Sequence, residues 1–209
     1  MEMVLMGKDK RGYSSSIGKL PFLFLETKKF AKLLCEGKSF DEILELSLKQ
    51  NIFQLDKEDR RKMVPLIITK RLKNLDEDLI NILANGDDDT AKLINFLSII
   101  KTDRLFFEFM WEVFRDKYIL KEPQMENKDF VFFFENKANQ SEQINNWGQN
   151  YIKKFISTYK TILCQANLCK REKTHFKIIK PIIHEITLLY IKKNRENDIY
   201  CEAMLLELK

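Results

Sequence analysis

Apolar side chains recur every three or four positions along most of the chain, which is the spacing of helices that bury one face. The first such run reaches Leu34, and Gly37 follows it in the place of a left-handed helix cap. Ser39 and Glu42 have the spacing of a capping box, so a second helix is expected to begin there. The pattern therefore predicts two short helices near the start of the globular part.

A third helix is predicted from Lys57 to Leu72, and Pro65 inside it should kink or split it. A short helix over 76–84 follows and stops at Asn85-Gly86, the clearest break in the chain. We place a domain boundary at that break. The expected organisation is a basic N-terminal arm over 1–20, an N-terminal helical subdomain over 21–86 and a C-terminal helical subdomain over 87–209.

The C-terminal subdomain keeps the helical periodicity except over residues 168–180, which suit a short hairpin, or wing. The predicted fold class is all-α, a multi-helix bundle of two packed helical subdomains, the second resembling a winged helix with a short hairpin. The helices expected in the second subdomain cover about 87–100, 103–114, 130–134, 141–163, 181–192 and 199–208.

Composition agrees with a helical globular protein. Of 209 residues, 44% are hydrophobic and 32% are charged, while Gly and Pro number 6 and 4. So few helix breakers favour long helices over a sheet with many turns. The net charge is +5, but the segment 151–195 holds eleven basic and two acidic residues and so carries +9. The basic charge is therefore concentrated in one part of the chain.

Neither export nor membrane insertion is suggested by the sequence. No secretory leader opens the chain, and no apolar run approaches the roughly 20 residues that cross a bilayer. Cys35, Cys164, Cys169 and Cys201 are too sparse for a disulfide scaffold of this size. We expect a cytoplasmic protein with free thiols and no membrane partner.

Three motifs resemble ligand sites without matching them. Gly37-Lys38-Ser39 lacks the earlier glycine and the preceding strand of a phosphate-binding loop, so a helix end followed by a helix cap is favoured. The acids at 87–89 lack the ligand order of a calcium loop and are expected to cap a helix. The cysteines and histidines within 164–184 are spaced too widely for structural zinc. We therefore expect no metal and no cofactor.

No catalytic constellation is evident either. A nucleophilic site needs a Ser or Cys with a base and an orienting group, but the chain has two histidines and no nucleophile-elbow motif. Paired carboxylates also catalyse reactions, and their placement in space is not visible in a sequence. The expectation is a protein that is not an enzyme and has no small-molecule substrate.

The basic segment is the feature that indicates a function. Binding to phosphates requires Lys and Arg on one face or loop, and here they fall on the predicted long helix and on the wing after it. A second basic cluster flanks the third helix, after a short helix and turn, which suits a helix-turn-helix. Solubility alone also explains lysine-rich faces, and that alternative stays open. The candidate DNA-binding residues are Lys153, Lys154, Lys160, Lys170, Arg171, Lys173, Lys177, Arg60, Arg61 and Lys62, and the second cluster continues with Lys70, Arg71 and Lys73.

A series of short landmarks runs from Tyr13 to Leu205, and its order and spacing matter more than any single match. The landmarks are Tyr13-Ser14-Ser15, Glu26-Thr27, Leu34 to Gly37, Ser39 to Ile43, Asn51, Arg71-Leu72, Phe106 to Val113, Trp147, Ile162 to Leu168 and Pro181. In this order they resemble the BrxA family of BREX (bacteriophage exclusion) phage-defence systems. Where that family has a small Ala-Gly-Leu turn, this chain has Ala166-Asn167-Leu168, and Asn tolerates the left-handed conformation such a turn needs.

The resemblance implies an all-helical, non-catalytic accessory protein that binds double-stranded DNA mainly through phosphate contacts, beside other BREX components. No family motif defines which basic residues touch DNA, so the candidate residues rest on charge alone. Two alternatives stay open at this point. One is a protein–protein adaptor within a defence complex that docks its basic face on an acidic partner, and the other is an RNA-binding helical protein.

Overall fold

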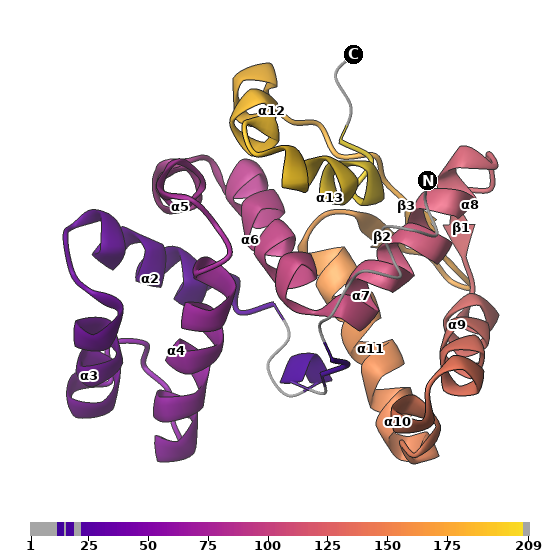
Figure 1. Ribbon diagram of the computed structural model, residues 1–209, viewed down its shortest axis with the longest axis horizontal. Coiled ribbons are helices and arrows are strands. Elements are labelled where there is room, and N and C mark those ends of the chain that lie inside the picture. The colour runs from indigo at the N-terminus through magenta and orange to yellow at the C-terminus, as the bar shows by residue number, and fades with distance from the viewer. Residues whose placement is uncertain (1–11, 15, 19–21, 207–209) are drawn as a thin grey trace.

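The structure is a computed structural model that describes residues 12–14, 16–18 and 22–206, and helices make up most of it (Figure 1). The basic side chains of the predicted arm at positions 8, 10, 11 and 19 lie outside the described residues. In the N-terminal half the elements are η1 (Ser16–Gly18), α2 (Phe24–Cys35), α3 (Phe40–Gln50), α4 (Glu58–Leu72) and α5 (Glu77–Asn85).

Local capping explains where the first helices begin and end. Gly37 has a φ of 88° just after α2, in the left-handed region that a glycine adopts without steric cost. The Ser39 side chain accepts a hydrogen bond from the Glu42 amide at 3.2 Å, and the Glu42 carboxylate accepts one from the Ser39 amide at 2.7 Å. The predicted capping box is therefore confirmed, and α3 ends at Asn51, whose φ of 49° is left-handed.

The expected split of the third helix at Pro65 was wrong, while the expected kink stays a prediction. Helix α4 runs unbroken from Glu58 to Leu72. A proline inside a helix leaves the carbonyl four residues earlier without its usual amide donor. Here that carbonyl belongs to Arg61, and the Ser47 hydroxyl of α3 donates a hydrogen bond to it at 2.7 Å. A contact between two helices thus replaces the lost backbone hydrogen bond.

Helix α6 (Asp88–Thr102) lies at the centre of the molecule, and a continuous helical run follows it and extends outward to α8 (Figure 1). That run comprises α7 (Arg104–Phe109), a π-helical segment η2 (Met110–Arg115) and α8 (Asp116–Ile119). Asp87 and Asp103 cap α6 and α7, since each carboxylate accepts a hydrogen bond from a backbone amide of the first turn. The acids at 87–89 thus lie at a helix start, as predicted.

Two helices of the C-terminal half differ from the predicted boundaries. The aromatic helix expected over 130–134 is the full-length α9 (Asn127–Gln140). The single helix expected from Ser141 is broken into α10 (Glu142–Asn145) and α11 (Gln149–Gln165), with Gly148 at the start of the second. The first error comes from a helix cap that lies outside the apolar periodicity, because Glu126 and Asp129 form a reciprocal capping box at the start of α9.

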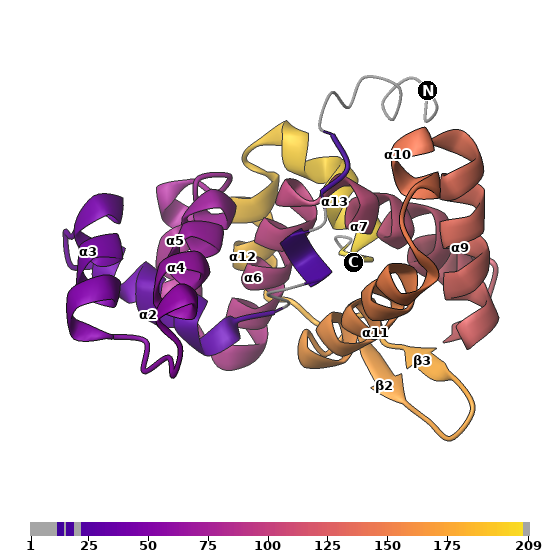
Figure 2. The same ribbon diagram turned by 90° about the horizontal axis from the view of Figure 1, so that it is seen from below.

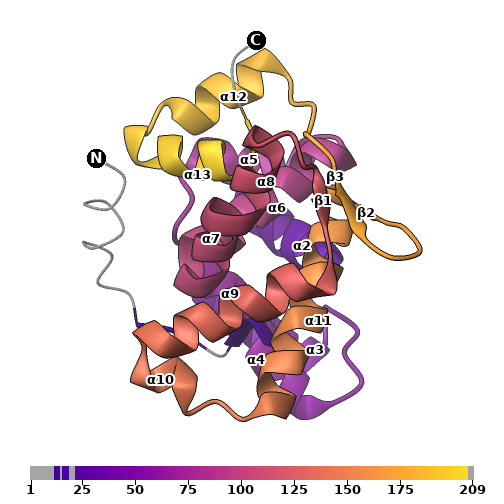
Figure 3. The same ribbon diagram turned by 90° about the vertical axis from the view of Figure 1, so that its right-hand side faces the viewer.

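A three-stranded antiparallel sheet has the strand order β1-β3-β2, and only β2 and β3 follow α11 in the chain. The hairpin of β2 (Cys169–Arg171) and β3 (Phe176–Ile178) confirms the predicted wing, while β1 (Gln124–Met125) was not predicted. The hairpin projects beyond the helices (Figures 2 and 3). The chain ends with α12 (Glu185–Lys192), η3 (Arg195–Asn197) and α13 (Asp198–Ala203), so the helix expected from residue 181 begins four residues later.

The buried apolar side chains form one cluster that includes residues from both halves of the chain. Phe30 and Leu79 contribute from the N-terminal half, and Phe106, Phe109 and Tyr159 contribute from the C-terminal half. The boundary predicted at Gly86 therefore does not separate two hydrophobic cores, and it stays a prediction. Within the described part of the chain, every helix is too short or too polar to cross a lipid bilayer.

Candidate nucleic-acid interface

Helix α11 directs one face into the core and leaves basic side chains on the other. Phe155, Tyr159 and Ile162 are buried, and the ring of Tyr159 lies 4.2 Å from that of Phe106. Lys153 and Lys154 are exposed near the start of the helix. The helical period thus holds the lysines on the outside because the aromatic side chains anchor the inside.

The hairpin carries basic side chains on both of its faces. Residues opposite each other on antiparallel strands project to the same side, and Lys170 pairs with Lys177 while Arg171 pairs with Phe176. Lys170 and Lys177 therefore share one face, and Arg171 projects from the other. Lys173 is exposed in the turn between the strands. The hairpin thus presents cations in two directions and at its tip.

The link between α11 and the hairpin is a tight left-handed turn. Asn167 has a φ of 59°, and the sequence-based expectation that Asn supports this conformation is confirmed. The Asn167 side-chain amide also donates a hydrogen bond to Asp89 at 2.9 Å, at the start of α6. The direction in which the hairpin leaves α11 is therefore fixed both by the turn and by a contact to a distant helix.

Lys160 is more constrained than the other candidate lysines. Its ammonium donates a hydrogen bond to Asn127 Oδ1 at 2.7 Å and lies 4.9 Å from the ring centre of Phe130 and 5.4 Å from that of Phe176. Burial lowers the pKa of Lys160, and the nearby Arg171 lowers it further. Lys160 and Arg171 therefore form a pair of neighbouring positive charges at the junction of α9, α11 and the hairpin.

A cleft of about 980 Å³ lies between α9 and α11 and reaches the hairpin. Figure 3 shows the two helices beside each other, with the hairpin at one side. Lys153, Lys160 and Arg171 line this cleft together with Trp147 and Phe176. Three of the ten candidate residues are thus brought into one concave site, which the sequence did not predict.

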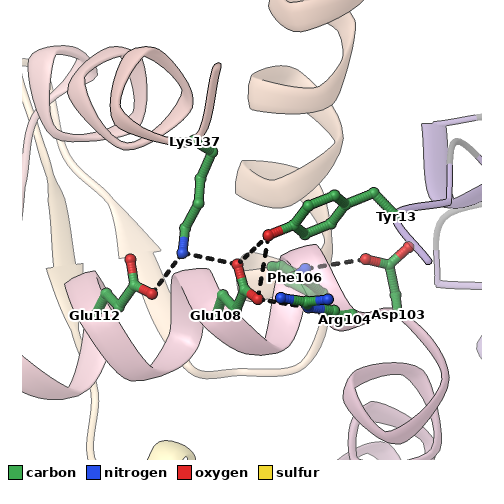
Figure 4. Close-up of polar contacts among 7 residues, drawn as sticks. All are labelled: Tyr13, Asp103, Arg104, Phe106, Glu108, Glu112 and Lys137. Carbon is green, nitrogen blue, oxygen red and sulfur yellow. Dashed lines mark hydrogen bonds and ion pairs between the residues drawn. The ribbon is translucent and has the colours of Figure 1, made fainter. Parts of the chain in front are cut away.

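The α9 wall of the cleft is held by a buried polar network (Figure 4). Lys137 of α9 forms ion pairs with Glu108 of α7 at 2.7 Å and with Glu112 of the π-helical segment at 2.6 Å. Arg104 pairs with the same Glu108 at 2.7 Å, and the Tyr13 hydroxyl donates to it at 3.2 Å. The network therefore joins α9 and the N-terminal segment to α7 and the π-helical segment η2.

Two groups of this network have raised pKa values. Burial, followed by the negative charge of Glu108, raises the pKa of Tyr13 to about 12, so its hydroxyl stays protonated and donates. Burial raises the pKa of Glu112, although the ammonium of Lys137 opposes the shift. Both shifts have the sign expected for groups removed from water.

The second basic cluster is less concentrated than the sequence suggested. Arg60, Arg61 and Lys62 lie in the first turn of α4, directly after the acids Glu58 and Asp59. The Arg61 side chain donates to the Leu55 carbonyl at 3.0 Å and is thus used to hold its own loop. The charge available at this end of α4 is therefore smaller than a count of bases implies.

The segment between α3 and α4 covers residues 51–57, which is longer than the three- or four-residue turn of a helix-turn-helix. Arg71, which the sequence grouped with the second cluster, is 3% exposed and directs a guanidinium nitrogen at the Phe22 carbonyl. Arg71 therefore belongs to the interior rather than to a binding surface. The helix-turn-helix stays a prediction without support from this geometry.

Arg60 is the member of that cluster that approaches α11. It lines a second cavity, of about 690 Å³, together with Cys164, Gln165 and Asn167 at the C-terminal end of that helix. Lys92 of α6 lines the same cavity. The fold thus brings one residue of the second cluster to the end of the helix that carries the first cluster.

Sequence reasoning missed the residues that shape the cleft between the lysines. Trp147 was placed within a long helix, but it lies in the break before α11, and its ring stacks on Phe155 with centres 5.0 Å apart. Asn127, which holds Lys160, precedes the predicted aromatic helix. The glycine at 148 was the available signal, since glycine inside a predicted helix often marks its end. Within the described ranges, no three His, Cys, Asp or Glu side chains are grouped as metal ligands.

Comparisons with known proteins give a consistent match over most of the chain. A family model described as BrxA matches residues 11–195. The "BREX protein BrxA" of Bacillus cereus (strain H3081.97) is 41% identical over 172 residues, which cover 82% of this chain and 86% of that protein. The "BREX protein BrxA" of Paramagnetospirillum magneticum (strain ATCC 700264 / AMB-1) is 22% identical over 184 residues, 88% of this chain and 92% of that protein.

Among solved structures, the crystal structure of an uncharacterized protein from Magnetospirillum magneticum has a similar fold. The TM-score is 0.79 at 21% sequence identity, and the superposition covers 93% of this chain and 99% of that one. At this level of identity the likeness concerns the fold alone, and it extends over nearly the whole described structure.

Proposed function

The chain belongs to the BrxA family of BREX proteins, and we propose that it is an accessory protein of phage defence that binds duplex DNA without catalysing a reaction. The family membership confirms the resemblance seen in the sequence. Binding to duplex DNA is the function that the arrangement of α11 and the hairpin supports best. The expected partners are double-stranded DNA and other components of the same defence system.

One observation carries the proposal: α11 and the hairpin hold seven basic residues around a projecting wing. These are the candidates at positions 153, 154, 160, 170, 171, 173 and 177. Glu172 is the acid among them, and it lies 3.6 Å from Lys170. A helix beside a projecting hairpin suits a duplex, since the helix can enter a groove while the wing follows the phosphate backbone.

The binding energy is expected to come mainly from phosphates. Each phosphate contact releases condensed counterions, so the logarithm of the affinity should fall with the logarithm of the salt concentration by about 0.9 per contact. Four or five contacts from α11 and the wing correspond to a slope of about −4. A slope near zero would contradict a phosphate-based mode of binding.

The test is a fluorescence-anisotropy titration of a labelled duplex of about 30 base pairs at several salt concentrations. The variant Lys170→Glu/Arg171→Glu/Lys173→Glu reverses three charges of the wing and should weaken binding at least about 10-fold for every DNA sequence, since phosphates carry no sequence information. A matched control, Lys32→Glu/Lys49→Glu/Lys57→Glu, makes the same charge change at exposed positions of the N-terminal half that belong to neither basic cluster. It should weaken binding much less.

Equal losses in the two triple variants would mean that net charge alone drives binding, and an unchanged affinity in the wing variant would refute the role of the wing. Unlabelled RNA and single-stranded DNA serve as competitors in the same titration. Duplex DNA should compete best. Stronger competition by RNA would favour the RNA-binding alternative instead.

The adaptor alternative is favoured by one observation, an exposed apolar surface around α12. Ile182 is 93% exposed, and Ile186 and Leu189 are each more than half exposed. Exposed apolar side chains grouped in this way are typical of protein contact surfaces. An adaptor that docks through this apolar surface predicts a complex with a partner subunit that forms without DNA and survives high salt, because salt screens charges and not apolar contacts. Replacing Ile186 and Leu189 by Ser should abolish that complex and leave DNA binding unchanged.

A further inference from the structure

The cleft between α9 and α11 combines a positively charged end with an apolar and amide-rich remainder. Its volume of about 980 Å³ lies at the upper end of the range for small-molecule sites, so it can enclose a compact ligand. Arg171 and Phe176 of the hairpin line one part of it, and Trp147, ahead of α11, also contributes to the lining. The cleft is therefore built from three segments that are distant in sequence.

The charged end is suited to an anion. Lys160 and Arg171 both line the cleft, and Phe176, which pairs with Arg171 in the hairpin, has its ring centre 5.4 Å from the Lys160 ammonium. Burial lowers the pKa of Lys160, and the guanidinium charge of Arg171 lowers it further. No carboxylate oxygen in the described part of the chain lies within 4 Å of Lys153, Lys160 or Arg171. Among the described residues, Glu135 is the one acid that lines the cleft. An anionic ligand would relieve the repulsion between these cations, as phosphate does at such clusters.

Lys160 is also held in place before any ligand arrives. Asn127 Oδ1 accepts one of its hydrogen bonds at 2.7 Å, and the rings of Phe130 and Phe176 lie within 5.5 Å of its ammonium. A lysine has three donors, so two remain for a ligand. Ordering this side chain in advance reduces the entropy lost on binding.

The remainder of the cleft is suited to a planar heterocycle. Trp147 supplies a ring that is stacked on Phe155 at an interplanar angle of 12°, which fixes its orientation. Val131 and Ile152 add apolar surface, and the amide side chain of Gln149 lines the same space. Stacking on an aromatic ring and hydrogen bonds from amides are the means by which proteins hold an unpaired base.

We propose that this cleft binds a nucleotide, with its phosphate at Lys160 and Arg171 and its base toward Trp147. The nucleotide is either free in solution or an unpaired residue of a DNA strand whose duplex lies on the basic surface. In the second case the inference deepens the proposed function, because it predicts a preference for duplexes with an overhang or bulge. In the first case it stands without that function.

The test fills the cleft and leaves its charges unchanged. Ser157 is exposed and lines the cleft from α11, so Ser157→Trp should occupy the space in which the base lies. Thr161→Trp provides a second obstruction from the same face. Asn150→Trp is the matched control, since residue 150 is exposed on α11 but does not line the cleft. Circular dichroism checks that each variant is folded.

Isothermal titration calorimetry with dAMP measures the free nucleotide, with deoxyadenosine and inorganic phosphate as partial ligands. Anisotropy with a blunt duplex and with the same duplex carrying a three-nucleotide overhang measures the unpaired nucleotide. We expect dAMP to bind with a Kd below about 1 mM, or the overhang to tighten binding at least about 3-fold over the blunt duplex. Ser157→Trp and Thr161→Trp should each raise the Kd for dAMP by about 10-fold and abolish the preference for the overhang. Asn150→Trp should leave both the Kd for dAMP and the overhang preference unchanged.

Each outcome has a definite meaning. Binding of dAMP identifies a free nucleotide as a ligand, and an overhang preference without dAMP binding identifies the unpaired residue of a strand. Absence of both, or a gain that persists in both obstructed variants, overturns the proposal. Binding of the blunt duplex is measured in the same series, so a failure of the nucleotide site is distinguished from a failure of the proposed duplex binding.

Discussion

Lys137 offers a quantitative test of the network that supports the cleft. Its side chain is 6% exposed and bridges Glu108, which is 5% exposed, and Glu112, which is 34% exposed. Removal of one partner from a buried ion pair costs about 3–5 kcal/mol, since the other charge stays in the interior without compensation. In Lys137→Met the Glu108 carboxylate keeps its ion pair with Arg104 at 2.7 Å. We therefore expect a loss near the lower limit, about 3 kcal/mol.

Urea denaturation followed by circular dichroism measures this loss. With a slope of about 2 kcal/mol per molar urea, 3 kcal/mol lowers the unfolding midpoint by about 1.5 M. The control is Lys49→Met, which removes an ion pair with Glu45 on the exposed surface of α3, where both side chains are more than half exposed. That change should cost at most about 0.5 kcal/mol. A loss in Lys137→Met that equals the loss in the control would refute the reasoning.

The pH dependence of the same variant supplies a second check. Burial raises the pKa of Glu112, and the Lys137 ammonium opposes that shift, so the pKa should rise further in Lys137→Met. A carboxyl with a raised folded-state pKa contributes most to stability while it is protonated, and this contribution is lost as the pH rises through the folded-state value. The destabilisation by Lys137→Met should therefore be smaller at about pH 5 than at about pH 8. A destabilisation independent of pH would contradict this assignment.

Two further predictions concern single backbone positions. Gly86→Ala should destabilise by about 1–3 kcal/mol, because an added Cβ would lie 2.5 Å from the Ile82 carbonyl oxygen. Gly148→Ala should change stability by less than about 0.5 kcal/mol, because beyond its chain neighbours no atom of the described residues lies within 4 Å of the added Cβ, and thermal unfolding compares the two variants. Asn167→Ala should lower the free energy of unfolding by about 1–2 kcal/mol, through left-handed backbone strain and loss of the hydrogen bond to Asp89. Asn167→Gly should cost less because glycine adopts that φ freely, and an equal loss in the two variants would assign the effect to the hydrogen bond alone.

Features that depend on a few adjacent residues could be predicted from the sequence. The capping box of Ser39 and Glu42, the cap at Gly37 and the left-handed turn at Asn167 all have the predicted form. Each is decided by hydrogen bonds or steric limits within about four residues, so the local sequence contains the necessary information. The hairpin after α11 was predicted for the same reason, since the loss of helical periodicity is visible locally.

Features that depend on contacts between distant segments could not be predicted in this way. Pro65 is tolerated because Ser47 of another helix donates to the carbonyl that the proline leaves without a donor. The sequence around Lys137 suggests a solvated lysine on a charged helix. In the structure, Glu108 of α7 and Glu112 of the π-helical segment hold its ammonium in the interior. A sequence shows the residues but not which side chains meet, because long-range packing overrides local preference.

The helical class, the family, the wing and the concentration of positive charge in one segment could all be inferred from the order of residues. Which of those charges lie side by side depends on how the helices pack. The packing of α9 against α11 places Lys160 and Arg171 in a cleft with Trp147, whereas the register of the hairpin directs Lys170 and Lys177 to the opposite face. The charge of a segment is the sum of its residues and can be counted from the sequence. A binding site also requires those charges to lie in a particular arrangement, because neighbouring groups must contact the same ligand. That arrangement is set by the burial of apolar side chains from every part of the chain.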